Sequence, residues 1–165
     1  MRNLPSPRHF VVGVMLLGAL AGCLGPQSPS VTPEVARVVR VTAQGLELQV
    51  ALSVTNPNGA AVDVREVEGT LLLEGGQKLG TGRSKPRLRI PAHGSSLVDS
   101  QVDVAWENLA ALREFVMRDR VPYTFQGKLT LGGAAVHFTL PFEMQGTLTR
   151  EQLLHAGFRG LFDAR

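Results

Sequence analysis

The chain has 165 residues, 44% of them hydrophobic, which is enough for one domain with a buried core and excludes a disordered chain. Its 17 Lys and Arg residues against 14 Asp and Glu residues give a formal net charge of +3, but Arg2 and Arg8 precede Cys23 and no acidic residue does. From Cys23 onward, 15 basic and 14 acidic side chains leave a charge of +1, which argues against a nucleic-acid partner because phosphate recognition needs a strong positive field.

Residues 1–22 have the three zones of a secretory signal peptide. Two arginines supply the positive charge, and the apolar run at 10–20 is too short to span a bilayer as a stable helix. The sequence Leu20-Ala21-Gly22-Cys23 follows this run and resembles the lipobox of bacterial lipoproteins. The resemblance implies cleavage before Cys23 and a diacylglyceryl lipid on its thiol. Cys23 is the only cysteine, so the chain cannot form an internal disulfide.

The lipid would tie the chain to a membrane, since each buried methylene contributes roughly 0.8 kcal/mol and two or three acyl chains anchor firmly. In bacteria with two membranes, Asp after the lipidated cysteine favours retention in the inner membrane. Leu24 stands at that position here, so the resemblance implies the outer membrane, facing the periplasm, or the plasma membrane of a cell with one membrane. Residues 23–34 are rich in Pro and are predicted to form a flexible, lipid-anchored tether.

From residue 35 onward, apolar and polar residues alternate with the period of two that is typical of strands. The clearest run is 46–55, in which five aliphatic residues point to one face: Leu46, Leu48, Val50, Leu52 and Val54. Further strands are predicted at 36–42, 62–73, 78–84, 96–105, 123–131 and 136–144. One buried and one wet face indicate antiparallel pairing. About seven short strands therefore predict an all-β fold, an immunoglobulin- or fibronectin-III-like antiparallel β-sandwich.

Turn residues punctuate these strands. The glycine pairs at 75–76 and 132–133 are predicted to make hairpin turns. Pro141 takes an outward position within its run and has no backbone donor, which indicates an edge strand or a bulge.

Two segments depart from the strand pattern. Residues 106–118 place apolar side chains at helical spacing, which predicts one helix between the late strands, packed across an open end of the sandwich and anchored by Trp106. In residues 149–165, Thr149 and Gln152 have the spacing of a capping box ahead of an apolar stripe. This amphipathic C-terminal segment is either a helix docked on the sheet or a contact for a partner or a membrane surface.

A family resemblance lies at the end of the clearest strand. The sequence Leu52-Ser-Val-Thr-Asn-Pro-Asn58, followed by Gly59, closely resembles the signature of the late embryogenesis abundant (LEA) type 2 family, whose domain is also called WHy, for water stress and hypersensitive response. The later sequence Ile90-Pro-Ala-His-Gly-Ser-Ser96 is similar to the family's Ile-Pro-Ala-Gly turn, with His93 as an inserted residue. The resemblance covers about residues 35–148 and implies a LEA type 2 domain there.

The motif Asn56-Pro57-Asn58-Gly59 has the chemistry of a structural turn. Pro57 fixes its own φ and biases Asn56 to an extended conformation. Both asparagines can bond neighbouring backbone groups, and Asn58-Gly59 tolerates positive φ. These properties favour a turn that ends the strand, with direct ligand binding as the alternative.

The sequence offers no catalytic or metal-binding constellation, and no cofactor is predicted. The histidines His9, His93, His137 and His155 lie far apart and at no metal-ligand spacing. By alternation, His137 faces solvent. Serines near His93 lack the Gly-x-Ser-x-Gly context of a hydrolase nucleophile. We therefore predict that the protein is not an enzyme.

The resemblance implies a membrane-anchored lipoprotein associated with desiccation or envelope stress, acting through weak binding of proteins or of a membrane surface. One alternative is an adaptor or assembly subunit of an envelope complex that accepts a partner at a strand edge. Another is a protein that binds a lipid or a small hydrophobic molecule between the helix and the sandwich. An open apolar cavity would favour the last alternative, and a packed core would not.

Overall fold

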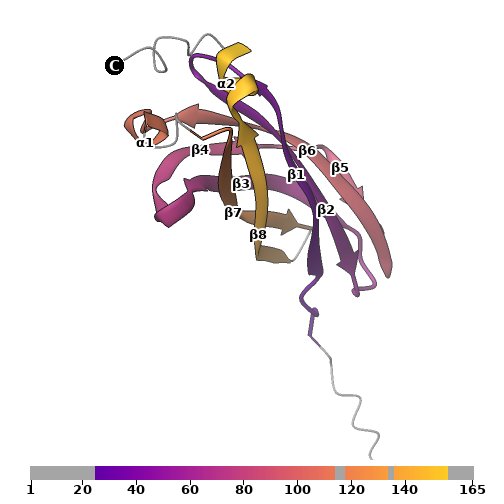
Figure 1. The fold of residues 1–165 in the computed structure, drawn as a ribbon. Helices are drawn as coiled ribbons and strands as arrows, with labels where there is room; N and C mark the ends of the chain where they lie inside the picture. The colour runs from indigo at the N-terminus through magenta and orange to yellow at the C-terminus, as the bar shows by residue number, and fades with distance from the viewer. Residues whose placement is uncertain (1–24, 114–117, 134–135, 156–165) are drawn as a thin grey trace, which may run out of the picture.

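The computed structural model describes residues 25–113, 118–133 and 136–155. Within these ranges most residues lie in β-strands, which confirms the all-β prediction (Figure 1). The strands are β1 (Ser30–Val41), β2 (Gly45–Asn56), β3 (Val62–Leu73), β4 (Lys78–Ser84), β5 (Leu88–Ile90), β6 (Gly94–Trp106), β7 (Arg120–Gly132) and β8 (His137–Thr149). Three short helical segments accompany them: η1 (Glu74–Gly76), α1 (Ala110–Arg113) and α2 (Arg150–His155).

The strands form one continuous antiparallel sheet in the order β1-β2-β6-β4-β3-β7-β8, with β5 paired to β3. The sheet curls until β1 contacts β8, and the hydroxyl of Tyr123 in β7 donates to the carbonyl oxygen of Ala36 in β1 at 3.3 Å. The molecule is therefore nearly a barrel, and the predicted division into two sandwiched sheets is not confirmed. The reason lies in β6, which pairs with β2 along its length and with β4 at its C-terminal end.

The strands β3 and β4 have the predicted bounds, 62–73 and 78–84. The strands β1, β2, β6, β7 and β8 are longer than predicted and have 12 or 13 residues each. Only β5 is very short, with three residues, and the sequence did not predict it. The charged neighbours Arg87 and Arg89 leave too few apolar positions there for a period of two to be recognised.

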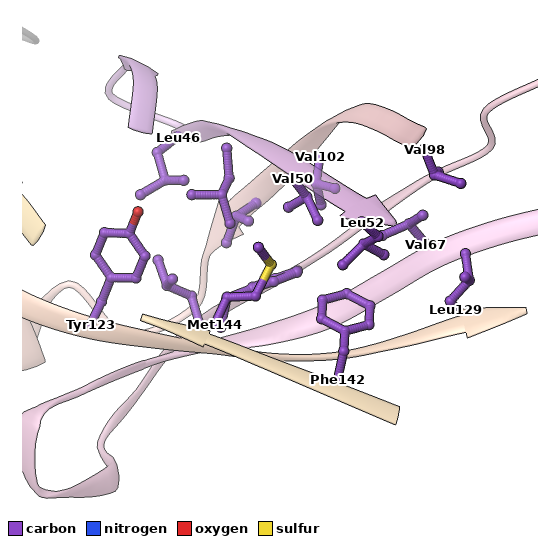
Figure 2. Packing of buried hydrophobic residues seen from close by; sticks show 14 of the residues in the cluster. Leu46, Val50, Leu52, Val67, Val98, Val102, Tyr123, Leu129, Phe142 and Met144 are labelled. Carbon is purple, nitrogen blue, oxygen red and sulfur yellow. The ribbon is translucent and has the colours of Figure 1, made fainter. Parts of the chain in front are cut away.

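The interior of the curled sheet is filled by inward-facing side chains. The five aliphatic residues predicted to face inward from β2 are all buried. Figure 2 shows Tyr123, Phe142 and Met144 of β7 and β8 facing the aliphatic residues of β2 across the core. The alternation of the sequence therefore places the core correctly, even though the sheet does not divide.

Aromatic rings cover glycines on the inner face between β7 and β8. Gly127 lies opposite Phe142, and a Cβ atom at Gly127 would stand 2.3 Å from the Cζ atom of that ring. Gly146 lies opposite Tyr123 in the same way, with 2.3 Å to the Oη atom. The absent side chains let each ring lie flat against the neighbouring strand.

The predicted tether needs a correction at residues 30–34, because β1 begins at Ser30 and pairs there with Thr55 of β2. Pro33 reads as a loop signal in the sequence, yet an edge strand tolerates proline because its outer side needs no backbone donor. Pro29, just before the strand, is buried.

The helix predicted at 106–118 is wrong at its start. Trp106 is the last residue of β6 and pairs with Gly80 of β4. Its indole N–H donates to the carbonyl oxygen of Thr42 at 2.9 Å, so the ring fastens strand ends rather than a helix. Within the described residues the helix comprises Ala110–Arg113, where the Asn108 side chain accepts the Ala111 N–H at 3.2 Å. Residues 114–117 of the prediction lie outside the described residues.

Two turns follow different rules. Gly75 and Gly76 have φ of 82° and 78° and connect β3 to β4, as their glycine pair predicts. Gly132 belongs to β7, and the N–H of Gly133 donates to the carbonyl oxygen of Val136 at 2.9 Å. The prediction of a turn at 132–133 is therefore wrong for Gly132, and residues 134–135 lie outside the described residues. Pro141 is exposed on β8, at the end of the sheet order, in agreement with an edge position.

The capping box at Thr149 is confirmed. The Gln152 N–H donates to Thr149 Oγ1 at 3.3 Å, and the Thr149 N–H donates to Gln152 Oε1 at 2.9 Å. Leu153 is buried, and Gln152 Nε2 donates to the carbonyl oxygen of Val38 at 3.3 Å. The described part of the C-terminal segment is thus docked on β1 and β8, and residues 156–165 lie outside the described residues. None of the described helices is long and apolar enough to cross a bilayer.

Candidate functional site

The lipobox-like residues Leu20, Ala21, Gly22 and Cys23 lie outside the described residues, which begin at Gly25. Lipidation of Cys23 therefore stays a prediction. The motif at the end of β2 is described in full, and it organises one end of the sheet.

Asn56 is the centre of this motif. Its side chain is fully buried, and its Nδ2 donates to the carbonyl oxygens of Ala60 at 2.9 Å and Pro91 at 3.1 Å. Its Oδ1 accepts the backbone N–H of Asn58 at 3.1 Å. A buried amide is stable only when its donors and acceptor are satisfied, and these three bonds satisfy them. Asn56 thereby joins the end of β2 to the following loop and to the connection between β5 and β6.

The side chain of Asn58 extends this hydrogen-bond network to the chain before β1. Its Nδ2 donates to the carbonyl oxygen of Gln27 at 2.7 Å, and the Gln27 N–H donates back to Asn58 Oδ1 at 2.7 Å. The side-chain amide thus pairs with the chain before β1 as a backbone peptide group would. Since Asn58 Nδ2 also donates to Asn56 Oδ1 at 3.1 Å, the two asparagines form one network.

The left-handed residue of this region is His93 rather than Asn58 or Gly59. His93 has φ of 50° and its N–H donates to the carbonyl oxygen of Asn58 at 3.0 Å. Neither Asn58 nor Gly59 has a positive φ, but a Cβ atom at Gly59 would stand 3.3 Å from Nε2 of His93. The inserted histidine of the family-like turn therefore packs against the glycine of the motif.

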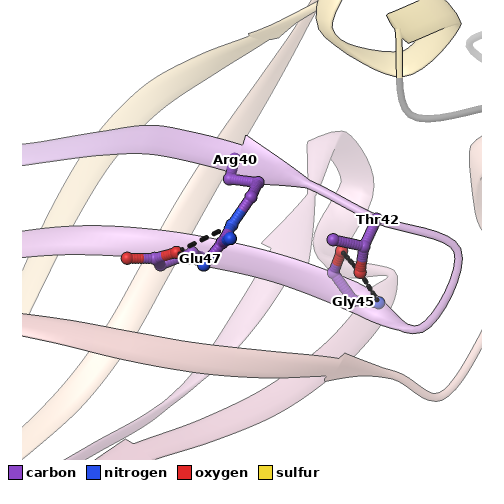
Figure 3. Close-up of polar contacts among 4 residues, drawn as sticks. All are labelled: Arg40, Thr42, Gly45 and Glu47. Atoms are coloured by element: carbon purple, nitrogen blue, oxygen red, sulfur yellow. Dashed lines mark hydrogen bonds and ion pairs between the residues drawn. The ribbon is translucent and has the colours of Figure 1, made fainter.

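A second arrangement crosses the outer face of the sheet. Six charged residues stand opposite one another on neighbouring strands, and we call them the charge belt: Arg40, Glu47, Asp103, Arg83, Glu68 and Lys128. Figure 3 shows its first pair, in which Arg40 Nε donates to Glu47 Oε2 at 3.0 Å, beside the Thr42–Gly45 turn. An open groove of about 680 Å³ lies over the rest of the belt. Sequence reasoning missed this belt, because it exists only once the register of six strands is known.

The described residues show little acid–base chemistry of a catalytic kind. Burial raises the pKa of Tyr123 to about 12, so its hydroxyl stays protonated at neutral pH. Hydrogen bonds, first from Lys78 and then from Thr81, lower the pKa of Glu107 below its ordinary value. No group of three or more His, Cys, Asp or Glu side chains within the described ranges could hold a metal ion. His93, His137 and His155 are exposed on three different segments.

The grooves of the described residues open to solvent. Besides the groove over the charge belt, one of about 380 Å³ lies beside Asn58 and is lined by Gly25, Gln27, Pro57 and Val136. The side chains seen in Figure 2 fill the space inside the sheet. This packing gives no support to a hydrophobic ligand held within the barrel.

Comparison with known proteins addresses the family. A family model described as late embryogenesis abundant protein matches residues 51–146. No curated protein matches the chain. The solution structure of AT1g01470 from Arabidopsis thaliana has a TM-score of 0.58 at 24% identity. The match covers 75% of this chain and 83% of the AT1g01470 chain. The solution structure of At2g46140.1, described as a LEA protein, has a TM-score of 0.54 at 21% identity. The match covers 74% of this chain and 71% of the At2g46140.1 chain.

At these identities, the two structures show a common fold and nothing more. The family model matches more than half of the chain and includes the Asn56 motif and the turn at 90–96. The resemblance recognised in those residues is thereby confirmed. The chain belongs to the late embryogenesis abundant type 2 family.

Proposed function

We propose that the protein is a non-enzymatic lipoprotein, anchored in a membrane through Cys23, that protects envelope components during desiccation or envelope stress. The observation that carries the proposal is a LEA type 2 domain that follows a lipobox-like sequence in the same chain. With Leu24 after the cysteine, the anchor would lie in the outer membrane and face the periplasm in a bacterium with two membranes.

The outer surface is suited to weak and unselective contact. Along the charge belt, basic and acidic side chains offer hydrogen bonds of both kinds while their charges largely cancel. The grooves are open and the core is filled, so no deep site exists in the described part for one tight ligand. Weak binding of many proteins, or of lipid headgroups, needs no such site.

The anchor is tested by the Cys23→Ala variant in the native host. The unaltered protein should incorporate labelled fatty acid and sediment with membranes, and the variant should do neither. Labelled fatty acid in the variant would contradict the anchor.

The protective role is tested by deleting the gene and measuring survival after drying, osmotic shock and envelope stress. Survival should fall, return with the unaltered gene and return only in part with Cys23→Ala, because the domain would then lie away from the membrane. Undiminished survival of the deletion strain under all three stresses would overturn the protective role and leave the anchor in place.

An adaptor subunit is the second candidate, favoured by the edge strand β1. Val35 and Val39 are 44% and 49% exposed on one face of this strand. Two register shifts in its pairing with β2, at Pro33/Val35 and Val38/Arg40, are of the kind that protect edges from strand addition, so a partner would contact the exposed valine side chains instead of adding a strand. Co-purification of a stoichiometric partner that is lost in a Val35→Lys variant would favour the adaptor over stress protection.

A further inference from the structure

The chain is bound to the domain at Gln27, three residues before β1 begins. Gln27 is held by its two hydrogen bonds with Asn58, and Pro29 is buried. The position of Gln27 is thus fixed relative to one end of the sheet. We call this end the Asn58 end and define it by residues 25–28, 57–60 and 91–95. Figure 1 shows the described chain entering here, with α1 and α2 at the opposite end.

Little chain separates this fastening from the lipid-bearing cysteine. Cys23 and Gln27 are four residues apart, and an extended chain spans at most about 3.6 Å per residue, or about 14 Å. The polar headgroup layer adds only a few ångströms to the hydrocarbon core on each side. A lipid on Cys23 would therefore hold the Asn58 end next to the headgroups.

The Asn58 end is also the uncharged part of the surface. No Asp, Glu, Lys or Arg occurs in 25–33, 48–62, 90–98 or 129–142. Its exposed residues include Ala60, Pro91 and Ala92, and nearby Leu97 is 59% exposed, the highest exposure among the exposed large hydrophobic side chains of the described residues. Such a surface contacts lipid headgroups without the free-energy cost of desolvating a charged side chain.

The charged residues next to this surface include an ion-pair cluster around Asp63. Asp63 lies 3.5 Å from Arg65 and 3.7 Å from Arg89, measured between carboxylate oxygen and guanidinium nitrogen. The opposite end is different, because Lys78, Glu107, Glu74 and Arg118 cluster there in two exposed ion pairs. Charge therefore distinguishes the two ends of the sheet.

We propose that the anchored domain stands on the bilayer with its Asn58 end against the lipid headgroups and its α1 and α2 end in the aqueous compartment. The inference rests on the proposed lipid anchor at Cys23. Its partner is the lipid surface of the membrane that holds the anchor, and contact does not depend on anionic lipid. Asn58 is the positioning residue, since its amide holds the start of the chain at this end.

Two exposed loop alanines allow a matched test. Ala92 lies at the Asn58 end, and Ala43 lies in the turn at the other end of β2, a strand whose 12 residues span about 36 Å. Each is changed to cysteine in the full-length, lipidated protein and labelled with an environment-sensitive fluorophore. The lipid occupies the sulfur of Cys23, so the introduced thiol is the only free one.

The labelled proteins are reconstituted into zwitterionic phosphatidylcholine vesicles that contain a lipid with a spin-labelled headgroup. We expect the label at Ala92 to be quenched several-fold more than the label at Ala43. The mass of the N-terminal peptide is measured on the same samples. A lipidated Cys23 with equal quenching at both positions overturns the orientation alone, whereas an unmodified Cys23 overturns the anchor and the orientation together.

The role of Asn58 is tested in both labelled backgrounds. Asn58→Ala removes the two bonds to Gln27 and should bring the ratio of quenching at Ala92 and Ala43 toward one, with Cys23 still lipidated. Asn108→Ala, a change of the same type at the other end, should leave the ratio unaltered. A ratio unaffected by Asn58→Ala in a folded variant overturns the positioning role.

A second variant leaves the domain intact should Asn58→Ala fail to fold. Ten Gly and Ser residues inserted between Leu24 and Gly25 add about 17 Å of mean reach. The ratio should again fall toward one. An undiminished ratio would show that the short connection does not orient the domain, and would contradict the proposal.

Discussion

Asn56 illustrates how much of the sheet end depends on one side chain. It is fully buried, and it serves backbone groups of the loop that follows β2 and of the segment before β6. The sequence shows that an Asn-Pro-Asn-Gly stretch can turn a strand. It cannot show that the bonds reach Pro91 and, through Asn58, Gln27, because those partners lie 31 to 35 residues away along the chain.

Asn56→Ala should therefore lower the free energy of unfolding by about 2–4 kcal/mol, since it leaves several buried or half-buried backbone groups without partners. Chemical denaturation with urea measures the loss. Gln101→Ala, on an exposed strand position, is the control and should stay within about 0.5 kcal/mol of the unaltered protein. Unchanged stability together with lost activity would contradict the structural role of Asn56 and favour direct ligand binding.

Tyr123 should make the protein sensitive to alkaline pH. Burial raises its pKa in the folded state to about 12, whereas in the unfolded chain it ionises near pH 10. Between these values the unfolded state binds fewer protons, so stability falls as pH rises. This contribution is fully present below about pH 10 and is lost as pH passes through about 12.

The urea midpoint should accordingly fall more between pH 9 and pH 11 for the unaltered protein than for Tyr123→Phe. At neutral pH the variant loses only one hydrogen bond, that of 3.3 Å to Ala36, at a cost of about 1 kcal/mol. Tyr123 is the only tyrosine, so phenolate absorbance reports its ionisation directly. Equal alkaline losses in both proteins would show that Tyr123 is not the group responsible.

At the scale of strands, β7 and β8 are joined by an aromatic ring over a glycine. Phe142 occupies the space that a side chain at Gly127 would need. Strand propensity alone would favour alanine over glycine at this position. Close packing therefore outweighs propensity there.

Gly127→Ala should lower stability by about 1–3 kcal/mol, the usual cost of overpacking a filled core. Adding Phe142→Leu should relieve part of this loss, so the double variant should be more stable than the sum of the two single losses predicts. Gly25→Ala is the control, because nothing lies within 4 Å of its added Cβ atom. Strict additivity of the two substitutions would contradict the contact.

Local alternation predicted these elements well where one face is buried along the whole strand. The inward residues of β2 illustrate this, since burial alone decides which way they point. Prediction failed where pairing with a neighbouring strand decides the secondary structure of a residue. Trp106 has helical neighbours in the sequence, but pairing with β4 extends β6 to include it. Residues 30–34 read as a tether because of Pro33, until pairing with β2 makes them an edge strand.

At the scale of the whole molecule, the charge belt is the feature least accessible to prediction. Its six residues are scattered from Arg40 to Lys128, and only the registers of five strand pairings bring them into one row. The near-neutral charge of the domain was evident from composition. The arrangement of that charge in one row of basic and acidic side chains was not.

Arg83 stands between Glu68 and Asp103, and Glu47 stands opposite Asp103, so Arg83→Glu would place acidic side chains opposite one another on four neighbouring strands. Like charges directly opposite are destabilising, and we expect a loss of about 1 kcal/mol. Salt at 1 M should recover most of it, since the Debye length is then about 3 Å. Arg87→Glu, outside the strands, is the control. A loss that persists in high salt would show that charge is not its cause.

The neighbourhood of β1 and β8 has a consequence for how the chain acquires its fold. The first and last strands complete the curl together, and Gln152 reaches a carbonyl group 114 residues before it. Such distant contacts close loops at a high entropic cost and slow folding. The sheet cannot complete its curl until its last strand has been synthesised. If the chain is exported as proposed, this delay would leave its earlier strands unfolded while they cross the membrane.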